Sequence, residues 1–331
     1  MTHIPLGKLI GSAIVWDNHA CMPLDPRDFS QFATLERCRD AGLNVISINV
    51  ASGDQTSADA LAMLTAFRGW IAEHSEGYMA VLTPDDAVQA KAAGKLGICF
   101  DIEGMAVLDN RLDLIELYYE LGVRWMLTAY NHANAVGGGC LDTKDCGLTP
   151  FGRSVVQEMN RVGMVVCGSH AGYRTARELI DTSSAPVIFS HSNPRAIWNS
   201  PRNIPDDLMI ACARRGGVVG INGIGPFLGA NDSRIETLVA HILYALDLIG
   251  EDHVGLALDY CFGEEDGLID FMAEYPALFP PENCGATGMK MVAPWRMDEI
   301  AEALDTKGIG LVTLQKLFGG NHFRIARDVW R

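Results

Sequence analysis

The chain has 331 residues, a hydrophobic fraction of 48% and a formal net charge of −15 at pH 7. This length allows a large buried core, and the acidic charge argues against a nucleic-acid surface, which needs clustered Lys and Arg. No apolar run reaches the roughly 18–20 residues of a membrane span, and the first residues do not form a signal peptide. We therefore expect a cytoplasmic globular protein with neither nucleic-acid nor membrane partners.

Short β-rich apolar runs recur along the chain with helical patterns between them. They predict strands at 12–19, 44–50, 96–102, 124–130, 165–169, 187–191, 217–224 and 254–259. Apolar spacing with the helical period occurs at 55–74, 109–121, 151–162, 172–182 and 233–250. Eight such units favour one (β/α)8 barrel domain over residues 1–331, with an open doubly wound sheet as the alternative.

The segment 109–121 has the clearest helical pattern. Leu112, Ile115 and Tyr119 are spaced to line one face, and Gly122 is the expected stop signal. The longest irregular region is 261–295, whose Pro and Gly content predicts an elaborated loop after the eighth strand. We expect this loop to be a lid over the barrel mouth or a contact in a homo-oligomer.

Four metal-competent residues stand where predicted strands stop: His19, Glu103, His170 and His191. The carboxyl ends of parallel strands meet at one mouth of an α/β barrel, where barrel enzymes keep their chemistry. Imidazoles and a carboxylate brought together without partners would be costly to bury, and a divalent cation supplies that partner. The pattern predicts a metal site.

Cys21 extends this pattern because it lies two residues beyond His19. Strand side chains alternate, so both side chains point the same way, and imidazole and thiolate are both good zinc ligands. Two alternatives remain open: Cys21 is a small apolar residue facing the barrel, or Asp17 takes its place as a ligand. Asp101 shares the parity of Glu103 and is a candidate partner for a metal-binding side chain.

The remaining histidines give a weaker signal. His132 follows Tyr130 and Asn131 in the sequence AYNHAN and is ambiguous, because its neighbours also face the mouth region. Five others are expected to be surface or packing residues: His3, His74, His241, His253 and His322. Nine cysteines are scattered without a CxxC pair, which argues against a structural zinc knuckle or a thioredoxin-like motif.

Several longer segments carry a resemblance to a known family. The chain resembles the renal (membrane) dipeptidase family of zinc peptidases, peptidase family M19, within the amidohydrolase-like barrels. The similarity covers nearly the whole chain in the same order. It is strongest in GLTPFGRSVVQEMNRVGMVV, in APVIFSHS followed by RNIPDDL, in VGLALDY and in GGNHFRIARDVW.

The resemblance implies a binuclear zinc site and a role for each matching residue. The bridging glutamate of the family matches Glu103, and the histidines of the second metal match His170 and His191. The arginine that grips the substrate carboxylate matches Arg202. The aspartate that handles the proton of the attacking water and of the leaving amine matches Asp259.

Two residues depart from the family pattern. The family's H-x-D pair matches His19-Ala20-Cys21, so a cysteine stands where the metal-binding aspartate belongs. A thiolate is a softer ligand than a carboxylate, and either it keeps zinc or the site holds a single metal. The family histidine that stabilises the oxyanion aligns with Tyr130, whose hydroxyl can still donate a hydrogen bond. His132 is the other candidate to reach the substrate.

Together these features predict a metal-dependent amide hydrolase of the dipeptidase type with one or two Zn²⁺ ions. The expected substrate is a dipeptide or another small carboxylate-bearing amide. Two alternatives are a divergent amidohydrolase acting on a lactam or N-acyl metabolite, and a non-catalytic binding protein on the same barrel. Joint retention of the metal residues, Arg202 and Asp259 weighs against the binding protein.

Overall fold

The sheet of this computed structural model consists of parallel strands. The structure describes residues 6–263, 272–273, 276, 280 and 288–331. Most of the expected loop at 261–295 lies outside these residues. The strands are β1 (Trp16–Cys21), β2 (Val45–Ser52), β3 (Tyr78–Ala80), β4 (Leu96–Glu103), β5 (Val123–Leu127), β6 (Val165–Cys167), β7 (Ile188–Phe189), β8 (Val218–Ile221), β9 (Val254–Leu256) and β10 (Tyr260–Cys261).

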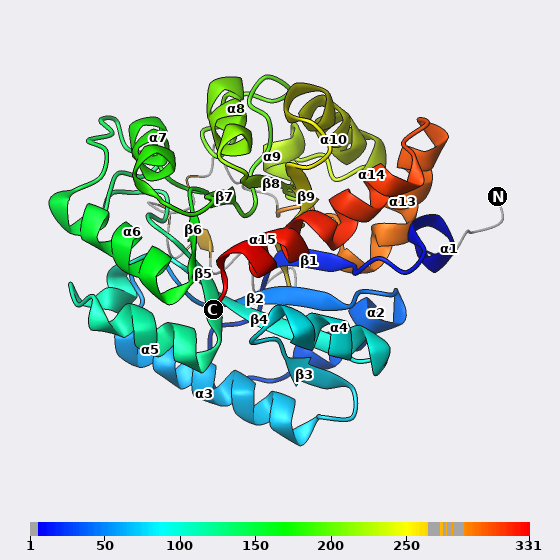
Figure 1. The fold of residues 1–331 in the computed structure, drawn as a ribbon, viewed down its shortest axis with the longest axis horizontal. Helices are drawn as coiled ribbons and strands as arrows, with labels where there is room; N and C mark the ends of the chain where they lie inside the picture. The colour runs from blue at the N-terminus through cyan, green and yellow to red at the C-terminus, as the bar shows by residue number, and fades with distance from the viewer. Residues whose placement is uncertain (1–5, 264–271, 274–275, 277–279, 281–287) are drawn as a thin grey trace.

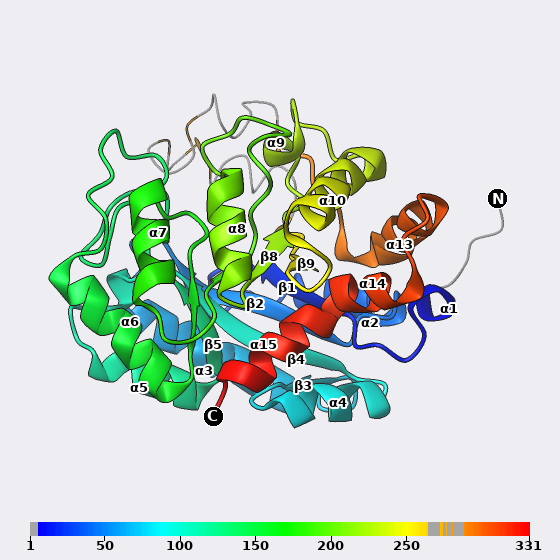
Figure 2. The same cartoon turned by 45° about the horizontal axis from the view of Figure 1, so that its top comes forward.

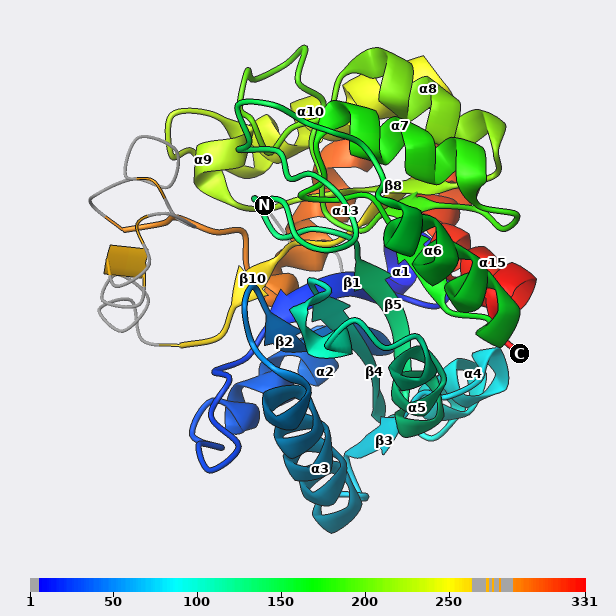
Figure 3. The same cartoon turned by 90° about the vertical axis from the view of Figure 1, so that its left-hand side faces the viewer.

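The strand order makes a closed barrel. Neighbouring strands follow the order β10-β1-β2-β4-β5-β6-β7-β8-β9, and β3 pairs with β4 outside this path. Only residues 257–259 separate β9 from β10, so the two ends of the order are joined by three residues. Figure 3 shows β10 beside β1. The predicted (β/α)8 barrel is therefore confirmed, and the open doubly wound sheet is excluded.

Helices surround the strands, as Figures 1 and 2 show. Those of the α type are α1 (Leu6–Ile10), α2 (Leu35–Asp40), α3 (Ser57–Glu73), α4 (Pro84–Ala92), α5 (Asp113–Leu121), α6 (Pro150–Val162), α7 (Tyr173–Thr182), α8 (Asp206–Arg214), α9 (Gly225–Leu228), α10 (Ile235–Ile249), α13 (Met297–Thr306), α14 (Leu311–Gln315) and α15 (Asn321–Val329). Shorter helical turns are η1 (Phe32–Thr34), η2 (Ala106–Leu108), η3 (Pro294–Arg296) and η4 (Lys316–Gly320). No helix in the described part of the chain is long and apolar enough to cross a membrane.

The helix α5 buries a wider face than the sequence pattern predicted. Ile115 is fully buried, and Leu112 and Tyr119 are partly buried and pack against the core, as expected. Leu114 and Tyr118 are buried as well. The Tyr118 hydroxyl donates a hydrogen bond to the Val107 carbonyl, which lets this amphipathic side chain enter the core. Gly122 ends the helix with φ 109°, as the stop signal predicted.

One end of the barrel is closed by α15. Ile325 and Val329 of this helix pack with Trp125, Val165 and Val218, which lie in the barrel strands. Figure 1 shows α15 crossing the strands. The opposite, carboxyl-terminal ends of the strands stay available for a functional site.

His322, at the start of α15, makes stability depend on pH. Its Nε2 lies 3.0 Å from the Leu256 carbonyl, and burial lowers its pKa to about 4. The unfolded chain, with a His pKa near 6.5, binds a proton that the folded protein excludes. The contribution of His322 to the free energy of unfolding is therefore fully present above about pH 6.5 and is lost as the pH falls toward 4. The loss is about 3 kcal/mol, because each pKa unit corresponds to about 1.4 kcal/mol.

This pH dependence can be checked by urea unfolding of metal-free protein between pH 7 and pH 4. His322→Gln retains an N–H donor but does not titrate there, so it should lose about 3 kcal/mol less than the unmodified protein over this interval. Parallel pH profiles for the two proteins would show that His322 does not titrate on unfolding.

Candidate metal centre

The carboxyl ends of the strands bring the predicted residues together. Three overlapping groups have ligand atoms within 4.8 Å of one another: His19, Cys21 and Glu103; His19, His191 and Asp259; and Glu103, His170 and His191. His170 and Asp259, together with Asn131, have φ angles of 59–63°, in the left-handed region that non-glycine residues seldom adopt. Such conformations cluster at functional sites, where the surrounding structure maintains them.

Each site histidine has a polar atom beside its Nδ1. His19 Nδ1 lies 3.3 Å from Asp101 Oδ2, His170 Nδ1 lies 2.8 Å from Asn131 Oδ1, and His191 Nδ1 lies 2.9 Å from Ser190 Oγ. Acceptors at Nδ1 favour the tautomer that leaves Nε2 unprotonated and able to bind a cation.

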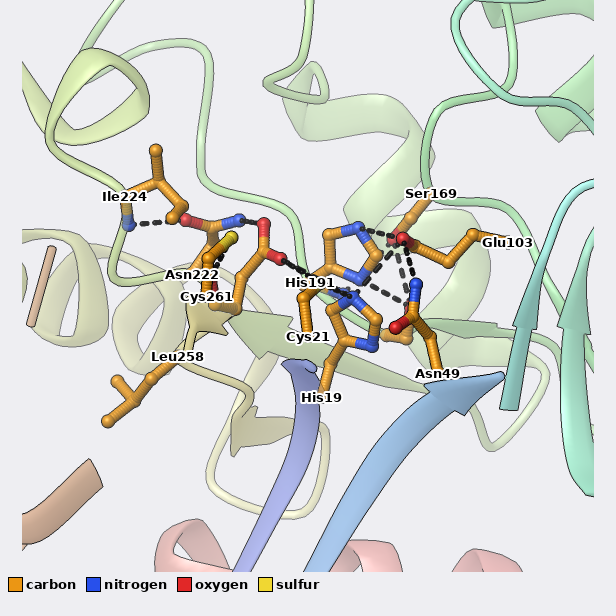
Figure 4. Close-up of polar contacts among 12 residues, drawn as sticks. His19, Cys21, Asn49, Glu103, Ser169, His191, Asn222, Ile224, Leu258 and Cys261 are labelled. Carbon is orange, nitrogen blue, oxygen red and sulfur yellow. Dashed lines mark hydrogen bonds and ion pairs between the residues drawn. The ribbon is translucent and has the colours of Figure 1, made fainter. Parts of the chain in front are cut away.

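The three Nε2 atoms converge on one carboxylate oxygen. Glu103 Oε1 lies 3.2 Å from Nε2 of His19, 3.5 Å from that of His170 and 3.3 Å from that of His191. The other oxygen, Oε2, accepts a hydrogen bond of 3.1 Å from Asn49 Nδ2. Figure 4 shows Asn49 and Glu103 beside the stacked rings of His19 and His191.

These separations suit ligand atoms that share a metal ion. With Zn–N and Zn–O bonds of about 2.0–2.1 Å, two ligand atoms lie about 3.3–3.4 Å apart. The distances from Glu103 Oε1 to the three histidines bracket this value. The Nε2 atoms of His170 and His191 are closer, at 2.9 Å, which is a hydrogen-bond distance, so a cation between them would move them apart.

Cys21 also lies beside His19, and ligand atoms of Cys21, His19 and Glu103 are within 4.8 Å of one another. Its Sγ is 3.6 Å from His19 Nε2 and 3.8 Å from Asp259 Oδ1. A zinc ion held by a thiolate at about 2.3 Å and an imidazole at about 2.05 Å would separate sulfur from nitrogen by about 3.5 Å. The side chains of His19 and Cys21 therefore point toward the same cluster, as their strand parity predicted.

The pKa shifts of most of these groups favour the protonation state that binds a cation. Burial would raise the pKa of Glu103, but the nearby His19 and His170 hold that pKa well below its usual range. Burial lowers the pKa of His170 to about 4 and that of His191 well below its usual value. Burial acts in the same direction on His19, but Glu103 and Asp101 outweigh it and raise its pKa. Cation binding at His19 must therefore displace a proton.

Asp259 is held at the edge of the cluster. Its Oδ1 lies 3.3 Å from His19 Nε2, and its Oδ2 accepts a hydrogen bond of 2.6 Å from Asn222 Nδ2. The Asn222 side chain in turn accepts a hydrogen bond of 2.6 Å from the Ile224 backbone N–H. This chain of contacts orients the Asp259 carboxylate toward the histidines.

A cavity of about 920 Å³ opens over the cluster. Arg202, Tyr130 and Phe227 are among its lining residues. Arg202 is only 6% exposed, its guanidinium carbon lies 5.2 Å from the centre of the Phe227 ring, and its Nη1 has no hydrogen-bond partner in the described part of the chain. A buried guanidinium with an unmet donor suits a carboxylate ligand.

Tyr130 stacks on His170, with ring centres 4.5 Å apart. Burial raises the pKa of its phenol well above the usual value, so the hydroxyl keeps its proton and remains a donor at neutral pH. His132 lies apart from the cavity lining found among the described residues, and its Nδ1 is 3.2 Å from Asp142 Oδ1.

Asp17 does not belong to the metal groups found among the described residues. Its Oδ1 accepts a hydrogen bond of 2.8 Å from the Leu258 N–H, and burial raises its pKa to about 7.

Sequence reasoning missed two residues that orient the site, Asn49 and Asn222. Asn49 is a polar residue near the end of the predicted strand 44–50, and that position could have identified it. Asn222 carries the same signal in 217–224.

A family comparison agrees with this geometry. A model described as membrane dipeptidase (peptidase family M19) matches residues 16–280, which include all the metal-centre residues. The chain belongs to this family. The resemblance inferred from the sequence motifs is confirmed.

The chain is also similar in sequence to individual dipeptidases. An uncharacterised dipeptidase of Schizosaccharomyces pombe is 30% identical over 73% of this chain and 63% of its own length. A dipeptidase of Claviceps purpurea is 30% identical over 74% of this chain and 54% of its own length. The chain thus spans little more than half the length of these relatives.

Solved structures share the whole architecture. An amidohydrolase from Pseudomonas aeruginosa has a TM-score of 0.89 at 28% identity, with 99% of both chains covered. A metallopeptidase from Rhodobacter sphaeroides, liganded with a phosphinate mimic of L-Ala-D-Ala, has a TM-score of 0.77 at 20% identity. The second similarity covers 96% of this chain and 100% of the other, and it establishes the fold alone.

Proposed function

We propose that this protein is a zinc-dependent hydrolase that cleaves an amide bond in a small carboxylate-bearing substrate such as a dipeptide. The observation that carries the proposal is the convergence of three imidazole Nε2 atoms on Glu103 Oε1, beside the cavity that Arg202 lines. The cavity volume of about 920 Å³ lies within the range of small-molecule sites.

Five side chains would hold the metal: His19, Cys21, Glu103, His170 and His191. When bound, zinc supplies Lewis acidity at the scissile carbonyl and makes a water nucleophilic near neutral pH. Asp101 and Asn49 would keep the His19 ring and the Glu103 carboxylate in place through their hydrogen bonds.

Three other side chains would act on the substrate. Arg202 would bind the substrate carboxylate through two parallel N–H donors, which fixes the position of the amide bond. Asp259 Oδ1 faces the cluster and would take a proton from the attacking water and pass it to the leaving nitrogen. Tyr130 would donate its hydroxyl proton as a hydrogen bond to the oxygen that becomes negative.

Arg202→Lys should raise KM for a dipeptide by about 10- to 100-fold, because one of two charged hydrogen bonds, each contributing about 1.5–3 kcal/mol, is lost. Steady-state kinetics on a zinc-loaded sample measures this change. Arg214→Lys, at the exposed end of α8, is the matched control and should leave KM unaltered.

A substrate panel tests the reaction class. It contains dipeptides with free and amidated C-termini, N-acyl amino acids and cyclic amides. Hydrolysis of free dipeptides with little hydrolysis of the amidated forms supports both the dipeptidase activity and the role of Arg202. Equal rates on the amidated forms would refute that role, and turnover of cyclic amides alone would favour the divergent amidohydrolase.

A further inference from the structure

Two cysteines stand side by side at the mouth of the barrel. Cys21 ends β1 and Cys261 ends β10, and the two are register partners in the parallel pair. The Phe262 N–H donates a hydrogen bond of 2.8 Å to the Cys21 carbonyl, which ties these strand ends together. Paired strands lie about 4.7–4.9 Å apart, within the Cα separation of about 4.4–6.8 Å that a disulfide spans.

The two thiols also lie close together and are accessible. The neighbouring Cys261 side chain is the largest cause that raises the pKa of the Cys21 thiol, and both cysteines are free thiols. Both residues are only partly buried and line the cavity above the metal centre, so a small solute that enters the cavity can reach them. Figure 4 shows Cys21 beside His19.

The other described cysteines lack this arrangement. Cys38, Cys99, Cys167 and Cys212 are buried, and Cys146 is exposed on a loop. Cys140 is partly buried, and its thiol donates to Asn131 Oδ1 at 3.5 Å. In the described sheet, the register partners of Cys99 and Cys167 are Ser47 and Ile188. Cys21 and Cys261 are therefore the pair that the sheet itself aligns.

We propose that Cys21 and Cys261 are an oxidation site that closes to a disulfide in the presence of a hydroperoxide, and that closure withdraws Cys21 from the metal centre. The disulfide follows from the strand register and from the position of both thiols in one cavity, independently of the activity. Its effect on metal binding rests on the proposed function, in which the Cys21 thiolate is a ligand.

The chemistry needs one hydroperoxide for each pair. The Cys261 thiolate attacks the outer oxygen of the hydroperoxide, the O–O bond breaks, and the alcohol (or water, from hydrogen peroxide) leaves after taking up a proton. The Cys21 thiol then attacks the sulfenic sulfur of Cys261, so that the S–S bond forms, and the thiol proton leaves with the hydroxide as water. The two sulfurs together lose two electrons, and the peroxide oxygens gain them. A dithiol reductant reverses the change.

Closure should alter the site because a metal binds a thiolate and not a neutral disulfide sulfur. His19 would keep its Nε2 but lose the sulfur that now lies 3.6 Å away. The first metal position would then keep only the His19 imidazole and the nearby carboxylates as ligands, and its affinity for the metal ion would be lower. Glu103, His170 and His191 would be unaffected, so a second metal position would survive.

The experiment treats metal-free full-length protein with hydrogen peroxide and maps its peptides without reduction. We expect a peptide pair joining Cys21 to Cys261, with the mass of two hydrogens lost and then restored by a dithiol. Cys261→Ser should abolish this cross-link, whereas Cys146→Ser, which changes an exposed loop cysteine, should leave it intact. The oxidised protein should then bind one zinc ion fewer per chain than the reduced protein.

Different results would overturn different parts of the inference. Alkylation of both cysteines after peroxide treatment, or a sulfinic acid at either one without a cross-link, would refute the disulfide. Equal zinc content in the oxidised and reduced forms would refute the withdrawal of Cys21. If the reduced protein binds no zinc, the proposed function fails, while the peptide map still decides whether the disulfide forms.

Discussion

Glu103→Gln is expected to remove bound metal and to lower kcat/KM by at least about 100-fold. Loss of a side chain that only orients a ligand costs about 10- to 100-fold in metal affinity or activity, and Glu103 is itself a proposed ligand. Its Oε1 lies within 3.2–3.5 Å of all three imidazole Nε2 atoms. An amide at this position has no negative charge with which to balance a divalent cation.

Metal content per chain after dialysis and steady-state kinetics on the same samples provide the measurement. The matched control is Glu120→Gln, an exposed position on α5, which should change neither quantity. Glutamine keeps the volume of glutamate, and its amide can still meet Asn49, so the variant should fold. Full metal content and full activity in Glu103→Gln would exclude Glu103 as the centre of the site.

The barrel could be predicted because strand and helix patterns alternate along the whole chain. The ends of elements were less accurate: β1 begins at Trp16 where the apolar run begins at residue 12, and β5 ends at Leu127 where the run extends to 130. Residues 128–131 leave the ladder there, and Asn131 adopts a positive φ. Apolar periodicity reports burial, and buried residues continue past the last strand hydrogen bond.

Most of the site could also be predicted, because its members follow strand ends. The sequence could not predict which side chains on different strands contact one another. The contacts of Asn49 with Glu103 and of Asn222 with Asp259 join residues 54 and 37 positions apart. The register of Cys21 with Cys261 depends on closure of the barrel between β1 and β10. Such contacts follow from tertiary arrangement and leave no local pattern.

Cys21→Ala is expected to lose one metal ion per chain, whereas Cys21→Asp should retain it. The thiol lies 3.6 Å from His19 Nε2 and 3.8 Å from Asp259 Oδ1, near the spacing of two ligands on one zinc ion. The methyl group of alanine offers no lone pair to a cation. Aspartate restores the carboxylate that stands in the family's pattern at this position, and a carboxylate oxygen binds zinc at about 2.0–2.2 Å.

Metal analysis of the two variants and of Cys146→Ala, an exposed control, distinguishes a metal ligand from a packing residue.

The neighbouring Cys261 side chain, and after it burial, raises the pKa of the Cys21 thiol. The metal must therefore displace a proton to bind there. Metal uptake by the unmodified protein should therefore weaken as the pH falls, and more steeply than in Cys21→Asp, because a carboxylic acid loses its proton at a lower pH than a thiol does. Full metal content and full activity in Cys21→Ala would show instead that the thiol only packs and that the imidazoles and Glu103 bind metal without it.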